Sequence, residues 1–285
     1  MGIGWQAGLL AGLARAGVAA SAADVVIGTS AGSVVGAQLT LGMDLGDVAR
    51  MVGSALDGPS PGPPAGKGPP GGEMEALLAA MAMALAPGGP PERGRRELGR
   101  LALAAPTMPE ERFTAMFDQL AGRPWPQPLH CTAVDTATGE LAVWDGAAGV
   151  DLQMAVASSC AVPGVFPPVT IGDARYMDGG MRSPLNADLA AGNAAVIVVS
   201  PLPLALPEGL SDLTFDRLLA QVEAELAILR EAGGLVEVVG PGQEFLELSS
   251  WGLRLMDASL VEAAAAAGGR QGEAEADRLR VIWRG

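Results

Sequence analysis

A short apolar run that leads into a serine between two glycines constrains this chain more than any other feature of its sequence. Residues 24–27 are mostly apolar, residues 28–32 read Gly-Thr-Ser-Ala-Gly, and residues 33–41 have the pattern of a helix that Gly42 closes. The pattern G-x-S-x-G between a strand and a helix is typical of a strained turn that lifts the serine hydroxyl clear of the sheet. The sequence therefore predicts a strand, a sharp turn at Ser30 and a helix.

Apolar runs and helical patterns alternate along the rest of the chain. Residues 194–200 and 235–239 are continuous apolar runs, which are typical of strands in a parallel sheet that is covered on both faces. Paired strands are predicted at 129–134 with 141–144 and at 168–171 with 175–177, and helices at 5–16, 73–86, 95–104, 109–121, 151–158, 212–230 and 256–267. Strands that alternate with helices favour an α/β protein with a mostly parallel central sheet flanked by helices.

Composition narrows the classes of function. The chain has 285 residues, of which 49% are hydrophobic and 18% charged, so it is long enough and apolar enough to fold as one large domain. Its formal net charge of -14 argues against nucleic acid or an anionic bilayer as a partner. No basic-then-apolar leader opens the sequence, and only Cys131 and Cys160 are present, so we expect a cytoplasmic protein with reduced thiols.

Few residues are available for acid-base or metal chemistry. The chain has one histidine, His130, and one lysine, Lys67, so we expect neither a metal centre nor a cofactor. A serine nucleophile needs a base, but His130 lies inside an apolar run, where a strand histidine satisfied by its neighbours is the more frequent outcome. Asp178 is the better candidate, because it ends a predicted strand and precedes Gly179-Gly180. An ordinary turn aspartate is the alternative interpretation of that residue.

Backbone amides near Ser30 are the candidate oxyanion donors. In the predicted turn, the N–H of Ala31 would face the oxygen of an attacked carbonyl group. Gly28 and Gly32 permit the turn, but together with Gly36 they also repeat every four residues, so a glycine-packed helix start is an alternative. A phosphate cradle at the same loop is disfavoured, because no lysine follows it as a P-loop requires.

These motifs resemble those of the patatin-like phospholipases. The likeness rests on the serine motif at 28–32 and on Asp178-Gly179-Gly180. The segment 157–168 also looks like the one that precedes the family's aspartate strand, and residues 135–140 resemble its Thr-Gly-Glu turn. The resemblance covers roughly residues 3 to 45 and 129 to 200.

The resemblance implies a fold, an activity and a partner. The fold is a three-layer patatin-like α/β domain over residues 1–285, with a Pro/Gly-rich loop at 58–72 and a helical, cap-like excursion at about 73–122. In the implied activity, Ser30 is the nucleophile and Asp178 the base of a Ser-Asp dyad that cleaves acyl esters through an acyl-serine intermediate. The substrate is an acyl ester or a phospholipid, reached by transient contact with a membrane interface.

The N-terminal part of the family pattern is incomplete in this sequence. The family begins with a strand and a glycine-rich loop, commonly with a basic residue, whose amides build most of the oxyanion hole; only Gly2 corresponds, to that loop's last glycine. The candidate oxyanion and backbone supports are Gly2, Ala31, Gly28, Gly32, Gly179 and Gly180. Either the sequence starts too late, or this form is a catalytically weak or inactive relative that binds acyl chains or a partner.

Overall fold

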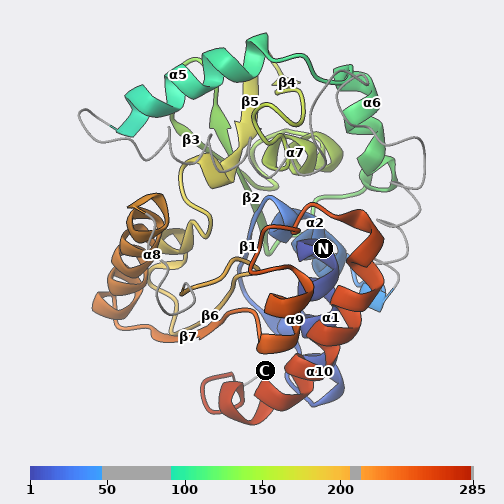
Figure 1. The fold of residues 1–285 in the computed structure, drawn as a ribbon, viewed down its shortest axis with the longest axis vertical. Helices are drawn as coiled ribbons and strands as arrows, with labels where there is room; N and C mark the ends of the chain where they lie inside the picture. Colours follow the sequence, from blue (N-terminus) through green and yellow to red (C-terminus); the bar gives the residue numbers. More distant parts are fainter. Residues whose placement is uncertain (47–90, 206–212, 284–285) are drawn as a thin grey trace. The chain divides into compact units, whose positions relative to one another are not determined.

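The computed structural model describes residues 1–46, 91–205 and 213–283, which fall into two compact units (Figure 1). The first unit comprises Met1–Val26, Gln38–Gly58 and Ala187–Gly285, and the second comprises Ile27–Ala37 and Pro59–Asn186. The predicted loop at 58–72, Lys67 and the predicted helix at 73–86 lie outside the described residues. None of the helices in the described ranges is long and apolar enough to span a bilayer.

The first unit combines helices with a two-stranded parallel sheet. Its elements are α1 (Gly2–Arg15), η1 (Ala20–Ala22), η4 (Ala187–Ala190), β6 (Ala195–Val199), α8 (Leu213–Glu231), β7 (Leu235–Val239), α9 (Gln243–Leu248), η5 (Ala258–Leu260) and α10 (Val261–Leu279). Strands β6 and β7 pair with Ala195 opposite Leu235 and Val199 opposite Val239. The parallel pair predicted from the two apolar runs is confirmed, although most residues of both strands are half-buried.

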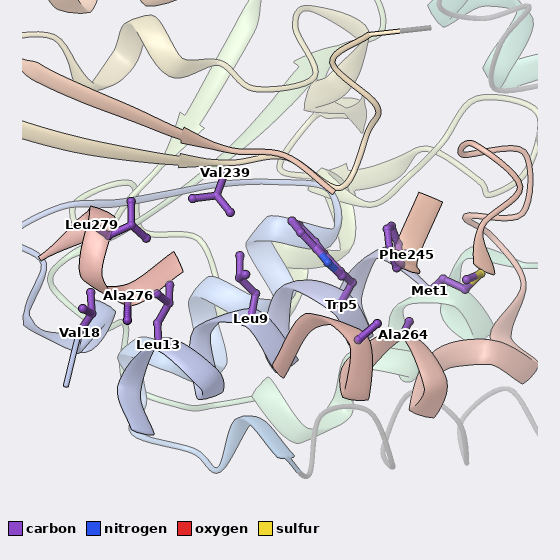
Figure 2. Packing of buried hydrophobic residues seen from close by; sticks show 11 residues of the cluster. Met1, Trp5, Leu9, Leu13, Val18, Val239, Phe245, Ala264, Ala276 and Leu279 are labelled. Atoms are coloured by element: carbon purple, nitrogen blue, oxygen red, sulfur yellow. The ribbon is translucent and has the colours of Figure 1, made fainter. Parts of the chain in front are cut away.

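The core of the first unit lies along α1 and α10 (Figure 2). Its buried residues are Met1, Trp5, Leu9, Leu13, Val18, Val239, Phe245, Ala264, Ala267, Ala276 and Leu279. The rings of Trp5 and Phe245 lie with their centroids 5.3 Å apart. The two helices touch backbone to backbone, because a Cβ at Gly8 would lie 2.0 Å from the carbonyl oxygen of Ala265.

Helix α10 is longer than the helix predicted at 256–267. It begins at Val261 and continues through Gly268 and Gly272 to Leu279. A Cβ at Gly268 would lie 2.2 Å from the carbonyl oxygen of Trp5, and one at Gly272 would lie 2.2 Å from that of Leu9. These glycines therefore do not end the helix: they provide the space that the α1 backbone occupies.

The second unit contains a five-stranded sheet with helices packed around it (Figure 1). Its elements are β1 (Val26–Thr29, which starts one residue before the unit), α2 (Ala31–Thr40, which ends beyond it), α5 (Pro91–Ala104), α6 (Glu110–Thr114), η2 (Ala115–Leu120), β2 (Leu129–Asp135), β3 (Leu141–Trp144), α7 (Leu152–Ser159), β4 (Val169–Ile171), β5 (Ala174–Asp178) and η3 (Gly179–Met181). The strand order is β1-β2-β5-β4, and β3 pairs with β2. Helix α7 packs on β2, β4 and β5.

The helices packed around the sheet confirm the α/β class, and the strand directions correct the predicted predominance of parallel pairing. β2–β3, β2–β5 and β4–β5 are antiparallel, whereas β6–β7 is parallel, so the strand pairing is mixed. The physical reason is the short connections: the tight turns at Gly139 (φ 72°) and Gly172 (φ 61°) join their strands as hairpins, which pair antiparallel. Both hairpins were predicted from the sequence.

Candidate active site

Ser30 sits at a strained turn between β1 and α2. β1 ends at Thr29 and α2 begins at Ala31, so Ser30 alone connects the two elements. Its φ is +52°, in the left-handed region that costs a non-glycine residue about 1 kcal/mol or more. The turn is tight as well as strained, because a Cβ at Gly28 would lie 2.4 Å from the Cα of Ser33. The predicted strand, sharp turn and helix are all present.

Hydrogen bonds from two other segments hold the Ser30 backbone. Its N–H donates to Ser159 Oγ at 3.0 Å, at the C-terminal end of α7. Its carbonyl oxygen accepts from Ser33 Oγ at 2.6 Å, from the Ser33 N–H at 2.9 Å and from Cys160 Sγ at 3.3 Å. Because the Ser30 backbone is bonded at both ends, the surroundings can maintain its left-handed conformation.

Asp178 is a buried carboxylic acid at the end of β5. The residue is 2% exposed, pairs with Ala133 of β2, and donates its N–H to the Ala161 carbonyl at 3.0 Å. Its Oδ1 accepts from the Gly180 N–H at 2.7 Å, whereas its Oδ2 is buried and none of the described residues donates a hydrogen bond to it. A buried carboxyl oxygen without a donor is costly, and it is available to take up a proton.

Burial and two donors set the acidity of Asp178. Desolvation raises its pKa from 3.8 to about 6, although the hydroxyl of Ser30 and the N–H of Gly180 both act in the opposite direction, as hydrogen-bond donors to the carboxylate. The structure thus places the Ser30 hydroxyl close enough to this carboxyl group to lower its pKa. The pKa of the neighbouring Cys160 thiol is raised as well, mainly by burial of the thiol and to a smaller extent by the charge of Asp178.

The two glycines after Asp178 allow a close approach of β2 and of the carboxylate. A Cβ at Gly179 would lie 2.3 Å from Thr132 Oγ1, and one at Gly180 would lie 3.0 Å from Asp178 Oδ1. Any side chain at Gly179 would therefore displace Thr132 or the turn. Asp178 also caps this turn, a 3-10 helix over Gly179–Met181.

A buried polar cluster that the sequence did not reveal joins the two candidate residues. Asn186 Nδ2 donates to Thr29 Oγ1 at 3.0 Å and to the Gly179 carbonyl at 3.2 Å, and Thr29 Oγ1 lies 2.8 Å from Thr132 Oγ1. The cluster thus contacts the residue before Ser30 and the residue after Asp178. One signal was present in the sequence, because Thr132 is, beside His130, a polar side chain in a largely apolar predicted strand.

The other candidate residues are placed as follows. His130 lies on β2 and its Nδ1 is 3.3 Å from the Pro128 carbonyl oxygen, a local contact of the kind expected for a strand histidine. Ala31 and Gly32 open α2, so their N–H groups belong to the first turn, which has no intrahelical acceptors. Gly2 is the first residue of α1 and belongs to the other unit. Among the described residues, no three His, Cys, Asp or Glu side chains are grouped to hold a metal ion.

A serine at a strand-to-helix elbow beside a buried carboxylic acid, on an α/β scaffold, is an arrangement typical of serine acyl hydrolases. Residues 1–191 match the family described as Patatin: Patatin-like phospholipase. The match covers well over half of the chain, so the chain belongs to the patatin-like phospholipase family, and this membership implies lipid acyl hydrolysis in general. A search of curated proteins finds no match to this chain.

Proposed function

We propose that this protein is a serine ester hydrolase of the lipase or phospholipase A type, in which Ser30 and Asp178 form a catalytic dyad. One observation carries the proposal: the strained turn places Ser30 beside a buried carboxyl group, one oxygen of which accepts from the Gly180 N–H while the other has no donor among the described residues. Family membership supports the activity class independently.

In each of its two half-reactions, the dyad accepts one proton and then donates it. Asp178 takes the proton from Ser30 Oγ while that oxygen attacks the ester carbonyl carbon, and it then gives the proton to the leaving alcohol. This step leaves an acyl-serine. Asp178 next takes a proton from water, whose oxygen attacks the acyl carbonyl; Ser30 Oγ leaves and recovers the proton, and a carboxylic acid is released.

Burial of Asp178 makes this proton transfer practicable without an imidazole. A carboxylate with the ordinary pKa of 3.8 is a weak base near neutral pH, whereas a pKa of about 6 brings the group closer to the operating range of a general base. The base must be ionised, so we expect the rate to rise with pH through about 6. The lone histidine, which bonds locally, is not needed in this scheme.

The oxyanion donors and the finer fold remain proposals. The N–H of Ala31 would stabilise the oxyanion from the first turn of α2, since the N–H of Ser30 is already bonded to Ser159. Gly2, Gly28, Gly32, Gly179 and Gly180 remain the proposed backbone supports. The three-layer arrangement as a single domain over 1–285, and the cytoplasmic location, also remain predictions.

The proposed substrate is the acyl ester of a lipid, in keeping with the family. The net charge of -14 favours neutral or zwitterionic interfaces, or dispersed esters, over anionic membranes. We propose that contact with such an interface is transient.

Covalent labelling combined with ester hydrolysis tests the proposal. A fluorophosphonate probe should modify Ser30, and a short p-nitrophenyl ester should be hydrolysed; Ser30→Ala should abolish both, and Asp178→Asn should remove most of the hydrolysis. Asp145→Asn is the matched control, because Asp145 caps an exposed turn through the Ala147 and Ala148 N–H groups and an asparagine oxygen still accepts. Folded protein that binds acyl chains but neither labels at Ser30 nor turns over ester would refute catalysis and favour the non-catalytic relative.

A further inference from the structure

Asn186 is a fully buried amide whose orientation is fixed by its neighbours. Its Oδ1 accepts from Arg182 Nη1 at 3.0 Å, and because a guanidinium only donates, the Nδ2 group must face the other way. On that side it meets the Ser183 carbonyl at 2.8 Å, Thr29 Oγ1 at 3.0 Å and the Gly179 carbonyl at 3.2 Å. Two amide hydrogens are shared among these acceptors.

One of these contacts is made to the peptide group that binds the Asp178 carboxylate. The carbonyl of Gly179 and the N–H of Gly180 belong to the same planar peptide unit and point in opposite directions. Asn186 donates to the carbonyl end, and the N–H end donates to Asp178 Oδ1 at 2.7 Å. The Gly179 carbonyl also accepts from the Arg182 N–H at 3.0 Å and from the Ser183 N–H at 3.4 Å. Asn186 is the side-chain donor at this carbonyl, and it adds to the bonds that keep the Gly180 N–H directed at the carboxylate.

A second contact of Asn186, to Thr29 Oγ1, is made at the turn that carries Ser30. Thr29 Oγ1 accepts from Asn186, so its own hydrogen is available for Thr132 Oγ1 at 2.8 Å. Thr132 Oγ1 in turn donates to the Gly28 carbonyl at 3.4 Å. The donors therefore run in one direction, from Asn186 through Thr29 and Thr132 to Gly28, and such chains strengthen one another inside a protein.

We propose that Asn186 is a positioning residue for the reaction, one that holds the Asp178 turn and the Ser30 turn in register through its bonds to Gly179 and Thr29. The inference rests on the proposed dyad and extends it to a residue that touches neither reacting atom. Asn186 itself has a φ of +49°, a conformation that asparagine tolerates better than most residues. Glycine at this position keeps the backbone and removes only the amide.

A buried asparagine could contribute only to stability, so the test needs measured quantities that a loss of stability alone would not change. We choose kcat and KM per fluorophosphonate-titrated site, which corrects for unfolded protein, and the titration of the Asp178 carboxyl group by NMR. The other titratable or charged groups at the site are the Cys160 thiol, which feels the Asp178 charge, and Arg182. The matched control is Asn193→Gly, because Asn193 is the only other asparagine and bonds locally to the Ala190 carbonyl.

For Asn186→Gly we expect kcat per titrated site to fall about tenfold to a hundredfold, with KM changed by less than about threefold. Because the Gly180 N–H then stabilises the carboxylate less, the Asp178 pKa and the acidic limb of the rate profile should move to higher pH. Thr132→Val should act in the same direction if Asn186→Gly does not fold, and Thr132→Ser should recover part of that loss. Asn193→Gly should match the wild type.

The outcomes separate this inference from the proposed function. If the wild type labels at Ser30 while Asn186→Gly keeps kcat within about twofold and leaves the Asp178 titration unchanged, the positioning role is refuted. If the wild type does not label at Ser30, the proposed dyad is refuted, and the role of Asn186 is then decided by the titration of the Asp178 carboxyl group alone. An Asp178 pKa that rises in Asn186→Gly but not in Asn193→Gly would still support control of this turn by Asn186, and an unchanged value would end the idea.

Discussion

The two units use the interior of the protein differently. In the first, α1 and α10 touch backbone to backbone, and the space around them is filled by apolar side chains such as Trp5 and Phe245 (Figure 2). In the second, the region around Ser30 is occupied by buried polar groups, including Thr132, Asn186 and Asp178. The first arrangement contributes stability. The second maintains a strained serine and a buried carboxyl oxygen to which none of the described residues donates a hydrogen bond, and both features cost stability.

Glycine shows the same contrast. Gly8 in α1 lies against the Ala265 carbonyl, so its missing side chain lets two helices pack. Gly179 lies against Thr132 Oγ1, so its missing side chain lets a polar group of β2 reach the Asp178 turn. The comparison predicts that substitutions in the first unit change stability, whereas substitutions around Ser30 change activity and can even raise stability.

The largest expected effect is that of Ser30→Gly. Removing the nucleophile should lower hydrolysis at least about ten-thousandfold, while release of the left-handed strain should raise the free energy of unfolding by up to about 1 kcal/mol. Urea denaturation and ester hydrolysis measure the two quantities. Ser250→Gly is the control, because Ser250 has a φ of +51° and belongs to the first unit. It should show the same small gain with activity retained; a loss of stability in Ser30→Gly alone would break the contrast.

Asp178→Asn should remove a pH-dependent loss of stability. The carboxyl pKa is about 6 in the folded chain against an ordinary 3.8, so the folded state holds its proton more tightly than the unfolded state. The associated stability is fully present below about pH 3.8 and is lost as the pH rises through about 6. Asparagine resembles the protonated acid, so the variant should exceed the wild type at pH 8 by at most about 3 kcal/mol.

The measurement is the difference in unfolding free energy between the Asp178→Asn variant and the wild type at pH 4 and at pH 8. A difference that does not grow between these two pH values would show that the folded carboxyl is not destabilised by burial.

Gly8→Ala tests the first unit. The added Cβ would lie 2.0 Å from the Ala265 carbonyl oxygen, so α1 and α10 must separate, and we expect a loss of about 1–3 kcal/mol. The matched control is Gly269→Ala in α10, whose Cβ would meet the flexible end of Arg15 at 3.2 Å and the Gly8 carbonyl oxygen at 3.7 Å, an ordinary contact distance. This change should be neutral or stabilise by up to about 1 kcal/mol. Thermal unfolding compares the two variants. Equal effects would mean that the close backbone approach does not control the stability of this unit.

Features that depend on residues close together in the sequence could be predicted, whereas features that depend on residues far apart could not. The strand-turn-helix at Ser30 and the hairpins at Gly139 and Gly172 depend on neighbouring residues, and all three were predicted. The continuation of α10 past Gly268 depends on α1, more than 250 residues earlier in the chain, so local helix-ending signals gave the wrong boundary. The preference for parallel pairing holds for β6–β7 but not for β2–β3, β2–β5 and β4–β5, because the apolar pattern of a strand does not specify its direction.

The candidate site divides in the same way. Ser30 and Asp178 were recognised because each lies in a short motif with small neighbours. Asn186 was missed, because its bond to Thr29 spans 157 positions and no local pattern marks it. The raised pKa of Asp178 was also out of reach, since it depends on burial that only the assembled sheet produces.

The smallest expected effect is that of Cys160→Ala, and it separates strong from weak contacts around Ser30. The Ser30 carbonyl accepts from Ser33 Oγ at 2.6 Å and from the Ser33 N–H at 2.9 Å, whereas the Cys160 thiol is a weak donor at 3.3 Å. Because the carbonyl remains satisfied without the thiol, hydrolysis by Cys160→Ala should stay within about threefold of the wild type. Ser33→Ala removes the shorter bond and should cost more, as kcat per titrated site would show. The reverse order would mean that the thiol, and not the hydroxyl, holds the Ser30 turn in its strained conformation.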